Sequence, residues 1–397
     1  MQFLFTDHGD KQTTGQRFLT FLLRLLVIVA IPLIAFFVLY QGFLFLRAGN
    51  APKWVISVVA ILWGVGGVAA LYWIFNWLVE LLPENWRRKL LPFVFVGPAI
   101  AILTWYLALP TVRTFWISLF GRDGPPQLAL TMLFTAPGEY FAALGEEFMG
   151  VSNYIAVFTN RLMREAFRNN IVFWIGIATP LTVMAGLLIA VLADRSRYES
   201  FFKSLIFLPM AISFVGASVI WRFVYAQRPA GETQIGLLNA ILGAFGGTPQ
   251  YWPAFTDIAP WNNVFLVLIV IWLQAGYAMV IFSAAIKGIP EELLEAARVD
   301  GATEIDAFFR ITIPYISGTI ITVTTTILIF TLKIFDVVWV MTGGQFGTEV
   351  ISTQFYRQSF IALNAGYGSA IAIVLVIAVI PVMIYNLRQF QQQEGFA

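Results

Sequence analysis

Residues 291–314 read EELLEAARVDGATEIDAFFRITIP, a charged segment between two long apolar runs. Pro290 can occupy the first position of a helix, and the glutamates that follow then lie in its first turn, where the helix dipole favours negative charge. Asp300 and Gly301 interrupt this helix, because glycine adopts positive φ without a steric cost. The segment therefore predicts a helix that ends in a tight turn.

A second helix is predicted directly after the turn. Thr303 and Asp306, three residues later, resemble a capping box, in which each residue satisfies a backbone N–H of the other. The small residues Ala296 and Ala297 leave one side of the first helix open to close approach. Such a two-helix hairpin outside a bilayer can enter a groove of a partner protein as a rigid lever. Periodicity alone equally allows a solvated loop whose charges only report topology.

The composition is that of an integral membrane protein. Of the 397 residues, 59% are hydrophobic and 12% are charged, and the mean hydropathy is +0.79. The net charge of +2 is too small, and the basic residues are too scattered, for a nucleic-acid partner. Cysteine is absent, which excludes disulfides and thiolate chemistry, and the lone His8 lies in a polar tail. We therefore expect no metal site, because such a site needs several converging ligands.

A helix that crosses about 30 Å of hydrocarbon needs about 20 apolar residues. By this rule, about eight stretches are long enough: 18–46, 55–82, 93–120, 170–193, 204–225, 264–286, 314–340 and 362–387. The first run is too long for a signal peptide and lacks a small-residue cleavage site, so we interpret it as an anchor helix. The expected fold is therefore an all-α membrane protein with about eight transmembrane helices.

Lys and Arg residues beside the spans predict the orientation of the chain. With the N-terminus inside, the cytoplasmic segments hold most of these residues, among them Arg87, Arg88 and Lys89, whereas the short loops on the other side hold few. We therefore expect both termini and residues 291–314 to face the cytoplasm.

Two long segments lie outside the predicted spans. Residues 121–168 contain Gly-Pro-Pro and Pro-Gly turns and then a predicted short amphipathic helix near 154–167, which together predict a small external cap. Residues 227–263 are rich in Gly, Pro and Trp. A loop of this length is usually functional or disordered, and the aromatic residues favour a folded external loop.

Two charges fall inside a predicted span, where each costs about 2.5–3.5 kcal/mol on insertion scales. Lys333 and Asp336 are three residues apart, so on one helix face they can neutralise each other as a structural pair. They can instead line a substrate path. An ion-coupled secondary transporter or channel would use the same two residues as its coupling element, and this class of function stays open at this point.

Catalytic chemistry is not indicated. Gly145 and Gly150 have the glycine spacing of a Walker A loop, but Val151 and Ser152 follow where Lys and then Ser or Thr must reach the phosphates. A membrane hydrolase would need converging acids or bases, and the external acidic residues are better explained as a solvated loop face: Glu139, Glu146 and Glu147. We predict no catalytic residue and no enzyme.

The segment at 289–314 resembles the EAA loop of permease subunits in binding-protein-dependent ABC importers. The residues that carry this resemblance are Glu295, Ala296, Ala297, Asp300, Gly301, Ala302 and Pro314. The resemblance implies that they couple the chain to an ATPase. Glu295 would offer a charge-assisted hydrogen bond to a basic group, and Gly301 would set the bend.

Further motifs extend the resemblance over about residues 93–387, toward the carbohydrate-uptake branch that includes the larger maltose-importer permease. They are G-x-x-N-Y at 150–154, F-L-P at 207–209, I-W at 220–221, G-x-x-N at 236–239, T-G-G at 342–344 and G-Y-G at 366–368. Two positions depart from the pattern. Ser317-Gly318 stand where the family often has a second proline, and Gln345 stands where proline is usual, so the resemblance does not extend to the local backbone geometry at these positions.

The resemblance implies a type I ABC importer permease core with a small external cap. Its domains would be an N-terminal extension with two transmembrane helices, a first core helix, an external cap and the remaining core, at 1–92, 93–120, 121–168 and 169–397. The implied partners are a homologous second permease, an ABC ATPase dimer that binds ATP and Mg²⁺, an external substrate-binding protein and membrane lipid. No cofactor is expected in this chain, which would lie in the inner membrane.

A sugar site combines hydrogen-bonding groups with aromatic rings. The resemblance places substrate contacts on the two helices that flank the loop: Leu273, Gln274, Tyr277, Phe330, Thr331 and Ile334. Lys333 and Asp336 are added as candidates for the same path. Each aromatic residue alone is equally explained by packing within a helix bundle. The expected function is half of the translocation path for a carbohydrate or glycoside.

Overall fold

The computed structural model describes residues 30, 34–35, 37–38, 40–49, 51–80, 84–128, 132–229, 231–254 and 256–394. In these ranges the chain is nearly all helical, and its only β contact is an isolated bridge between Phe120 and Phe148. The chain divides into two compact units, residues 1–110 and 111–397. The predicted all-α fold is therefore confirmed.

The first unit contains a pair of long apolar helices. They are α2 (Lys53–Glu80) and α3 (Glu84–Leu103), followed by the π-helical segment η2 (Thr104–Ala108). The rings of Tyr72 and Phe95 join α2 to α3, with 5.8 Å between their centroids. Of the predicted first span, residues 40–46 are helical, whereas most of 18–39 and His8 lie outside the described residues.

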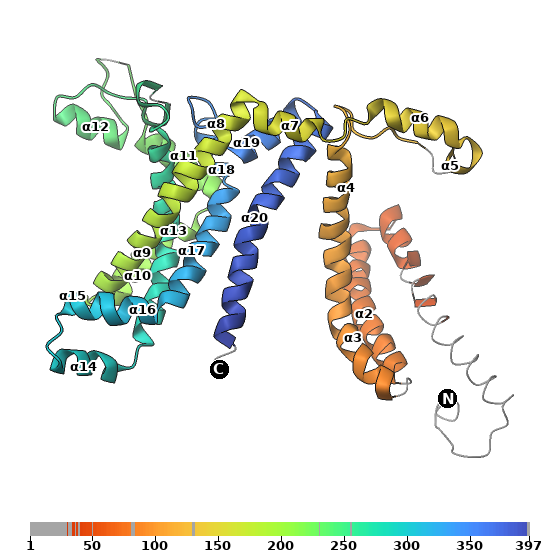
Figure 1. Ribbon diagram of the computed structural model, residues 1–397, viewed down its shortest axis with the longest axis horizontal. Helices are drawn as coiled ribbons and strands as arrows, with labels where there is room; N and C mark the ends of the chain where they lie inside the picture. The colour runs from red at the N-terminus through yellow and green to blue at the C-terminus, as the bar shows by residue number, and fades with distance from the viewer. Residues whose placement is uncertain are drawn as a thin grey trace. The chain divides into compact units, whose positions relative to one another are not determined.

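The second unit is built around α13 (Asn263–Lys287), which packs against α9 (Thr179–Asp194), α10 (Glu199–Phe207) and α17 (Ser317–Leu332). Two glycines allow this packing. A Cβ on Gly186 would lie 2.3 Å from the Cβ of Ala278, and one on Gly276 would lie 2.5 Å from the carbonyl oxygen of Ile206. α20 (Ala365–Glu394) packs beside α17, and these helices run between the two ends of the unit (Figure 1).

Four helices in the described residues are long and apolar enough to cross a membrane, or up to six if each of two bent pairs is one span. The bends correct two predictions of continuous helices. Residues 204–225 form α10, η4 (Leu208–Ala211) and α11 (Phe214–Val224), with a bend of 104°. Pro209 lacks a backbone N–H, and the Ser213 hydroxyl accepts from the N–H of Gly216 to start α11.

The other bend lies in the predicted span 314–340. Helical residues Glu304–Tyr315 meet α17 at 68°. α17 then ends at Leu332, and the chain continues as the short helix α18 (Asp336–Met341), α19 (Ile351–Tyr356) and η8 (Arg357–Ile361). The spans predicted at 55–82, 264–286 and 362–387 begin within three residues of their predicted starts. The span predicted at 93–120 begins earlier, at Glu84 of α3, and α8 (Arg161–Asn169), η3 (Asn170–Ala178) and α9 form one longer helical run.

The two predicted external segments have helices of their own. After α4 (Leu109–Ser118), residues 121–168 contain α5 (Met132–Thr135), α6 (Pro137–Glu147) and α7 (Ser152–Thr159). The single helix expected near 154–167 is two, because Asn160 is extended and its side chain caps α8. Residues 227–263 contain α12 (Leu237–Ala244), η5 (Trp252–Ala254) and η6 (Thr256–Ile258), so this loop is folded as expected.

Three of the sequence motifs stabilise the backbone at the end of the second unit that carries residues 121–168 and 227–263. The amide of Asn153 donates to the carbonyl oxygens of Ser118 and Phe120, at 2.9 and 2.7 Å. The amide of Asn239 donates to the carbonyl oxygens of Ala226 and Gln250, at 2.9 and 3.0 Å. Gly366 lies so close to Phe120 that a Cβ would be 2.1 Å from its carbonyl oxygen. These motifs therefore have structural roles.

Candidate functional site: an exposed helical hairpin

The hairpin consists of α14 (Glu291–Val299), a turn, and α15 (Glu304–Ala307), which continues through η7 (Phe308–Thr312) and α16 (Ile313–Tyr315). Pro290 is the residue before the first helical position, one place earlier than expected. The backbone N–H of Ala302 donates to Ala297 O at 2.9 Å, and that of Gly301 donates to Arg298 O at 3.1 Å. With φ of +83° at Gly301, this is a Schellman motif, which ends α14 at the predicted residue.

The second helix begins with the predicted capping box. The N–H of Asp306 donates to Thr303 Oγ1 at 3.1 Å, and the N–H of Thr303 donates to Asp306 Oδ2 at 3.3 Å. Both helices are therefore fixed at the turn by backbone hydrogen bonds, and no flexible linker separates them. The predicted helix, tight turn and helix are confirmed.

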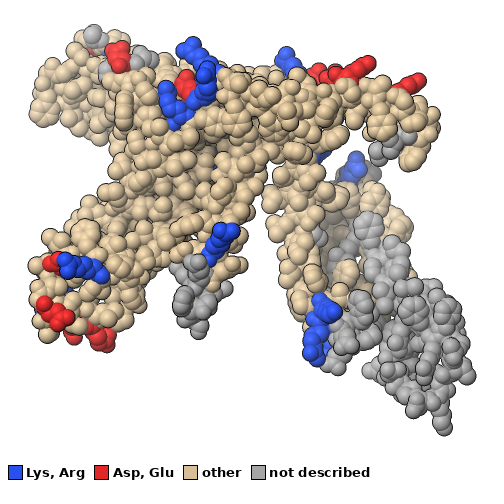
Figure 2. Space-filling model, viewed as in Figure 1, with Lys and Arg blue, Asp and Glu red and all other residues tan. Residues whose placement is uncertain are grey.

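The two helices beside the turn, α14 and α15, have no buried residue. Glu295 of α14 is exposed. Val299 and Ile305, on the two sides of the turn, are 87% and 71% exposed although both are apolar. In Figure 2, acidic and basic side chains gather on this end of the second unit, at the lower left, whereas the surface between this end and the upper end shows no charged side chain in this view. The hairpin therefore presents apolar and charged groups together outside the apolar helices.

The base of the hairpin is anchored in the core. Ile289 and Ile316, just before and just after it, are 7% and 2% exposed and belong to one apolar cluster with α9, α13 and α17. Leu294 of α14 packs against the same cluster. The hairpin is therefore packed directly against three helices of the core.

Glu304 links the hairpin to the end of α9. Its carboxylate pairs with Arg195 at 3.0 Å and with Arg298 of α14 at 3.2 Å. All three side chains are more than half exposed, so each pair contributes about 0–1 kcal/mol. Two pockets of about 220 Å³ each share Arg195, Glu304 and Phe308 in their walls. No local sequence pattern indicates this bridge, because Arg195 is 109 residues away from Glu304.

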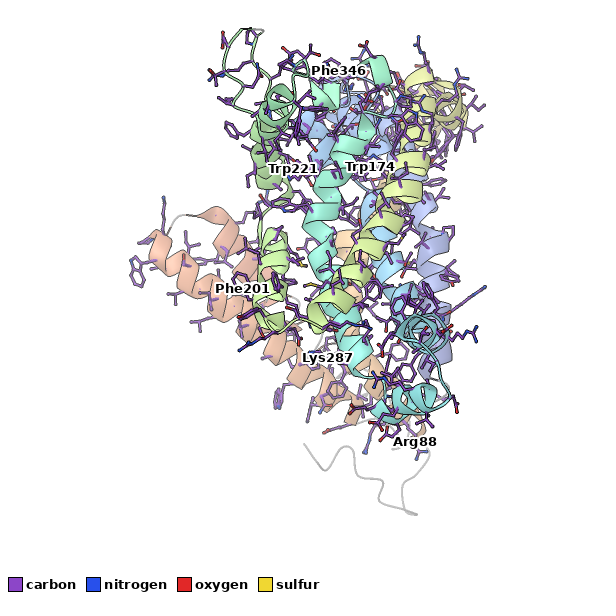
Figure 3. The ribbon with its side chains drawn as sticks, turned by 90° about the vertical axis from the view of Figure 1, so that its left-hand side faces the viewer. Arg88, Trp174, Phe201, Trp221, Lys287 and Phe346 are labelled. Carbon is purple, nitrogen blue, oxygen red and sulfur yellow. The ribbon has the colours of Figure 1, made fainter. Side chains whose placement is uncertain are left out.

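A second polar cluster lies near the hairpin, where α9 and α13 end and α10 begins. Lys203 contacts Asp194 and pairs with Glu199 at 2.6 Å, and Lys287 also contacts Glu199. The hydroxyl of Ser283 donates to Asp194 Oδ1 at 2.7 Å. Lys287 lies toward the hairpin end of the unit, opposite Phe346 (Figure 3). These ion pairs tie the three helix ends together.

The predicted substrate-path residues do not form one surface. Leu273 and Ile334 are each 2% exposed and belong to the same apolar cluster, against which Phe330 packs. Thr331 is fully buried, and its hydroxyl lies 2.9 Å from that of Thr179. By contrast, the half-buried residues keep part of their surface outside the core: Gln274, Tyr277 and Phe330.

The expected pair of Lys333 and Asp336 on one helix face is wrong. α17 ends before Lys333, and Asp336 is the first residue of α18, so a break in the helix separates them. No ion pair joins these two side chains, both of which belong to the described residues. Asp336 instead lies in a first helical turn, where the helix dipole favours a carboxylate.

Buried asparagines form a third group at the opposite end from the hairpin. Asn169 donates to the carbonyl oxygens of Gly347 and Glu349, at 2.8 and 2.9 Å. Asn170 donates to Leu332 O at 3.1 Å and accepts from the N–H of Ile351 at 3.0 Å. These roles were not predicted from the sequence. The Asn-Asn pairs at 169–170 and 262–263, each at the start of an apolar run, are the signal that could have found them.

Apolar helices packed around α13, with a rigid exposed hairpin at one end, define a multi-pass membrane protein with a structured extramembrane element. Residues 152–393 match the family described as binding-protein-dependent transport system inner membrane component, and the chain belongs to this family. It is 48% identical over 301 residues to the osmoprotective compounds uptake permease protein GgtC of Synechocystis sp., covering 76% of this chain and 99% of that protein.

A second relative and a solved structure are also similar to this chain. The chain is 41% identical over 355 residues to the alpha-glucoside transport system permease protein AglF of Rhizobium meliloti, covering 85% of this chain and 98% of that protein. Its fold matches a chain of a bacterial ABC transporter involved in alginate import, with a TM-score of 0.60, 22% identity, and 78% and 98% of the two chains covered. The chain is therefore a permease subunit of an ABC importer, and the ion-coupled alternative is excluded.

Proposed function

We propose that this chain forms one half of the translocation path of an importer for a carbohydrate or glycoside. The names of its relatives support this class: one is an alpha-glucoside permease, one transports osmoprotective compounds, and a third, 27% identical over 296 residues, is the lactose permease of Rhizobium radiobacter. A related fold occurs in a complex with an alginate-bound periplasmic protein. The choice among glycosides would rest largely with the external binding protein.

The observation that carries the coupling role is the hairpin geometry. In this proposal the ATPase contacts Glu295, Ala296 and Ala297 on α14, while Asp300, Gly301 and Ala302 hold the turn. Pro314 then belongs to the segment that leads back into α17. Because the Schellman motif and the capping box fix the two helices to each other, a push on α14 moves the whole hairpin and the helices at its base.

The proposed assembly contains further subunits. The described residues form one such hairpin, and two ATPase subunits that close on each other need two, so we propose a homologous second permease as partner. ATP and Mg²⁺ would be bound in the ATPase dimer, with no cofactor here. An external binding protein would meet the end opposite the hairpin.

The same proposal places the chain in the inner membrane with both termini cytoplasmic. The last described residues of α20 lie toward the hairpin end of the second unit (Figure 1), which supports this orientation for the C-terminal end.

For the substrate path, we propose that Gln274, Tyr277 and Phe330 contact the solute directly. Their side chains combine a hydrogen-bonding amide, a phenol and a ring, which are the groups that a sugar requires. Leu273, Thr331 and Ile334 would shape the path from behind, since the core covers them. Asp336 stays a candidate for the path.

Substitution of Gly301 tests the coupling. A Gly301→Val chain must place a β-branched residue at φ of +83°, which costs about 1–2 kcal/mol, whereas no atom lies within 4 Å of the added Cβ. We expect transport in reconstituted vesicles to fall by about tenfold or more while the associated ATPase still hydrolyses ATP.

The matched control is Gly243→Val in α12, where φ is ordinary and the added Cβ also meets nothing within 4 Å. Transport at the wild-type rate by Gly301→Val, or transport by the purified chain without any ATPase, would contradict the proposed coupling.

A further inference from the structure

A groove runs along the side of α20 in the second unit. Its volume is about 420 Å³, and it is lined by Lys333, by Phe355 and by aliphatic side chains within residues 372–383. Lys333 is the one lining residue that carries a hydrogen-bonding side chain, since the others are Phe, Ala, Leu, Val, Ile and Met. The groove therefore has apolar walls and one cationic side chain, that of Lys333.

The position of Lys333 along the span is set by the helix before it. α17 begins at Ser317, beside the hairpin, so sixteen residues at 1.5 Å each place Lys333 about 24 Å away along the helix axis. This distance brings the ammonium group to the membrane surface opposite the hairpin, where long cationic side chains reach polar headgroups.

Lys333 has no ion-pair partner among the residues that the structure describes. Its side chain is exposed. An unpaired cation at the end of an apolar groove is complementary to an anionic headgroup attached to a hydrocarbon chain. A sugar does not fit this groove, because its hydroxyl groups would lose their hydrogen bonds to water against aliphatic walls.

We propose that this groove binds one anionic phospholipid, with an acyl chain along α20 and the headgroup phosphate on Lys333. This assignment is independent of the transported solute, and it removes Lys333 from the predicted substrate path. The helix break after Leu332 then has a physical reason, because it turns the Lys333 side chain toward α20 rather than toward Asp336.

Native mass spectrometry of the purified full-length chain tests this site. The detergent-solubilised protein is titrated with phosphatidylglycerol and, in parallel, with zwitterionic phosphatidylcholine. For Lys333→Gln we expect one tightly held phosphatidylglycerol to bind about fivefold more weakly, the factor that corresponds to about 1 kcal/mol per lysine at a membrane surface. Ala372→Trp, which fills the groove and keeps the lysine, should lose the same lipid.

The control is Arg388→Gln, an exposed cation on α20 that is not part of the groove. It removes the same charge from the same helix and should leave the tight lipid in place, and melting temperatures confirm that each variant is folded. If wild type, Lys333→Gln and Ala372→Trp held the phosphatidylglycerol equally tightly, the proposal would be overturned. Equal binding of phosphatidylcholine, or cross-linking of Val379→Cys to a second permease subunit in the full complex, would also overturn it.

Discussion

At the scale of single residues, Glu349 is a buried acid of the second unit. It is 4% exposed and lies outside the candidate membrane spans. Burial raises the pKa of its carboxyl group, although a hydrogen bond from Thr353 and the charge of Arg357, 3.3 Å away, oppose this shift. A Cβ on Gly344 would lie 2.6 Å from the same carboxylate. The folded loop therefore encloses a carboxyl group whose pKa burial holds above its ordinary value.

A pH dependence of stability follows. Because the pKa is higher in the folded chain than in the unfolded chain, the stabilising contribution is complete below the ordinary glutamate pKa and is lost as the pH rises through the folded pKa. We expect the melting temperature of the wild type, relative to Glu349→Gln, to fall as the pH rises from about 4. Glu139→Gln, at an exposed site on α6, is the control. If the melting temperatures of wild type and Glu349→Gln changed with pH in parallel, Glu349 would not be the source of the pH dependence.

At the scale of elements, the hairpin obtains its rigidity from local hydrogen bonds. α15 is only four residues long and has no buried residue, so its own packing contributes little. The capping box and the Schellman motif instead satisfy backbone groups that a short helix leaves free at its ends. The rigidity of the proposed lever is thus a property of the turn.

Removal of the cap should loosen the lever. In Thr303→Ala the N–H of Asp306 loses its acceptor, at a cost of about 1 kcal/mol. We expect faster amide hydrogen exchange across residues 303–307, with the exchange of α13 unchanged. Thr159→Ala provides the control, since the Thr159 hydroxyl donates to Ile155 O and caps no helix start. Unchanged exchange at 303–307 would mean that the cap does not hold the second helix.

At the scale of the whole molecule, the second unit has two polar ends and an apolar middle. Ion pairs connect α9, α10 and α13 at the hairpin end, whereas buried asparagines hold the loops at the other end. Apolar helices between them suit a bilayer, because helices satisfy their own backbone hydrogen bonds where water is absent.

The orientation of this unit can be measured directly, because the chain has no cysteine. A single cysteine in place of Glu292 on α14 should react with a membrane-impermeant maleimide only after the membrane is opened. A cysteine in place of Glu139 on α6 should react in intact spheroplasts. Labelling of the Glu292 position from outside would overturn the cytoplasmic assignment of the hairpin.

The sequence by itself determined the membrane class, the limits of the spans predicted at 55–82 and 264–286, and the hairpin, down to Gly301 and the pair of Thr303 and Asp306. These features depend on contacts between residues a few positions apart, so composition, period and turn chemistry are enough to predict them. The family motif at Asn153 was also visible as a pattern, although not as a brace for Ser118 and Phe120.

Only the tertiary structure decided the partners of the polar groups. Arg195 meets Glu304 across 109 residues, Asn169 meets Gly347 across 178 residues, and Lys333 faces α20 rather than Asp336. A span that looks continuous in hydropathy can also break, as α17 does before Lys333, because hydropathy records burial and not backbone direction. Such contacts depend on how distant helices pack, and a local pattern carries no information about that packing.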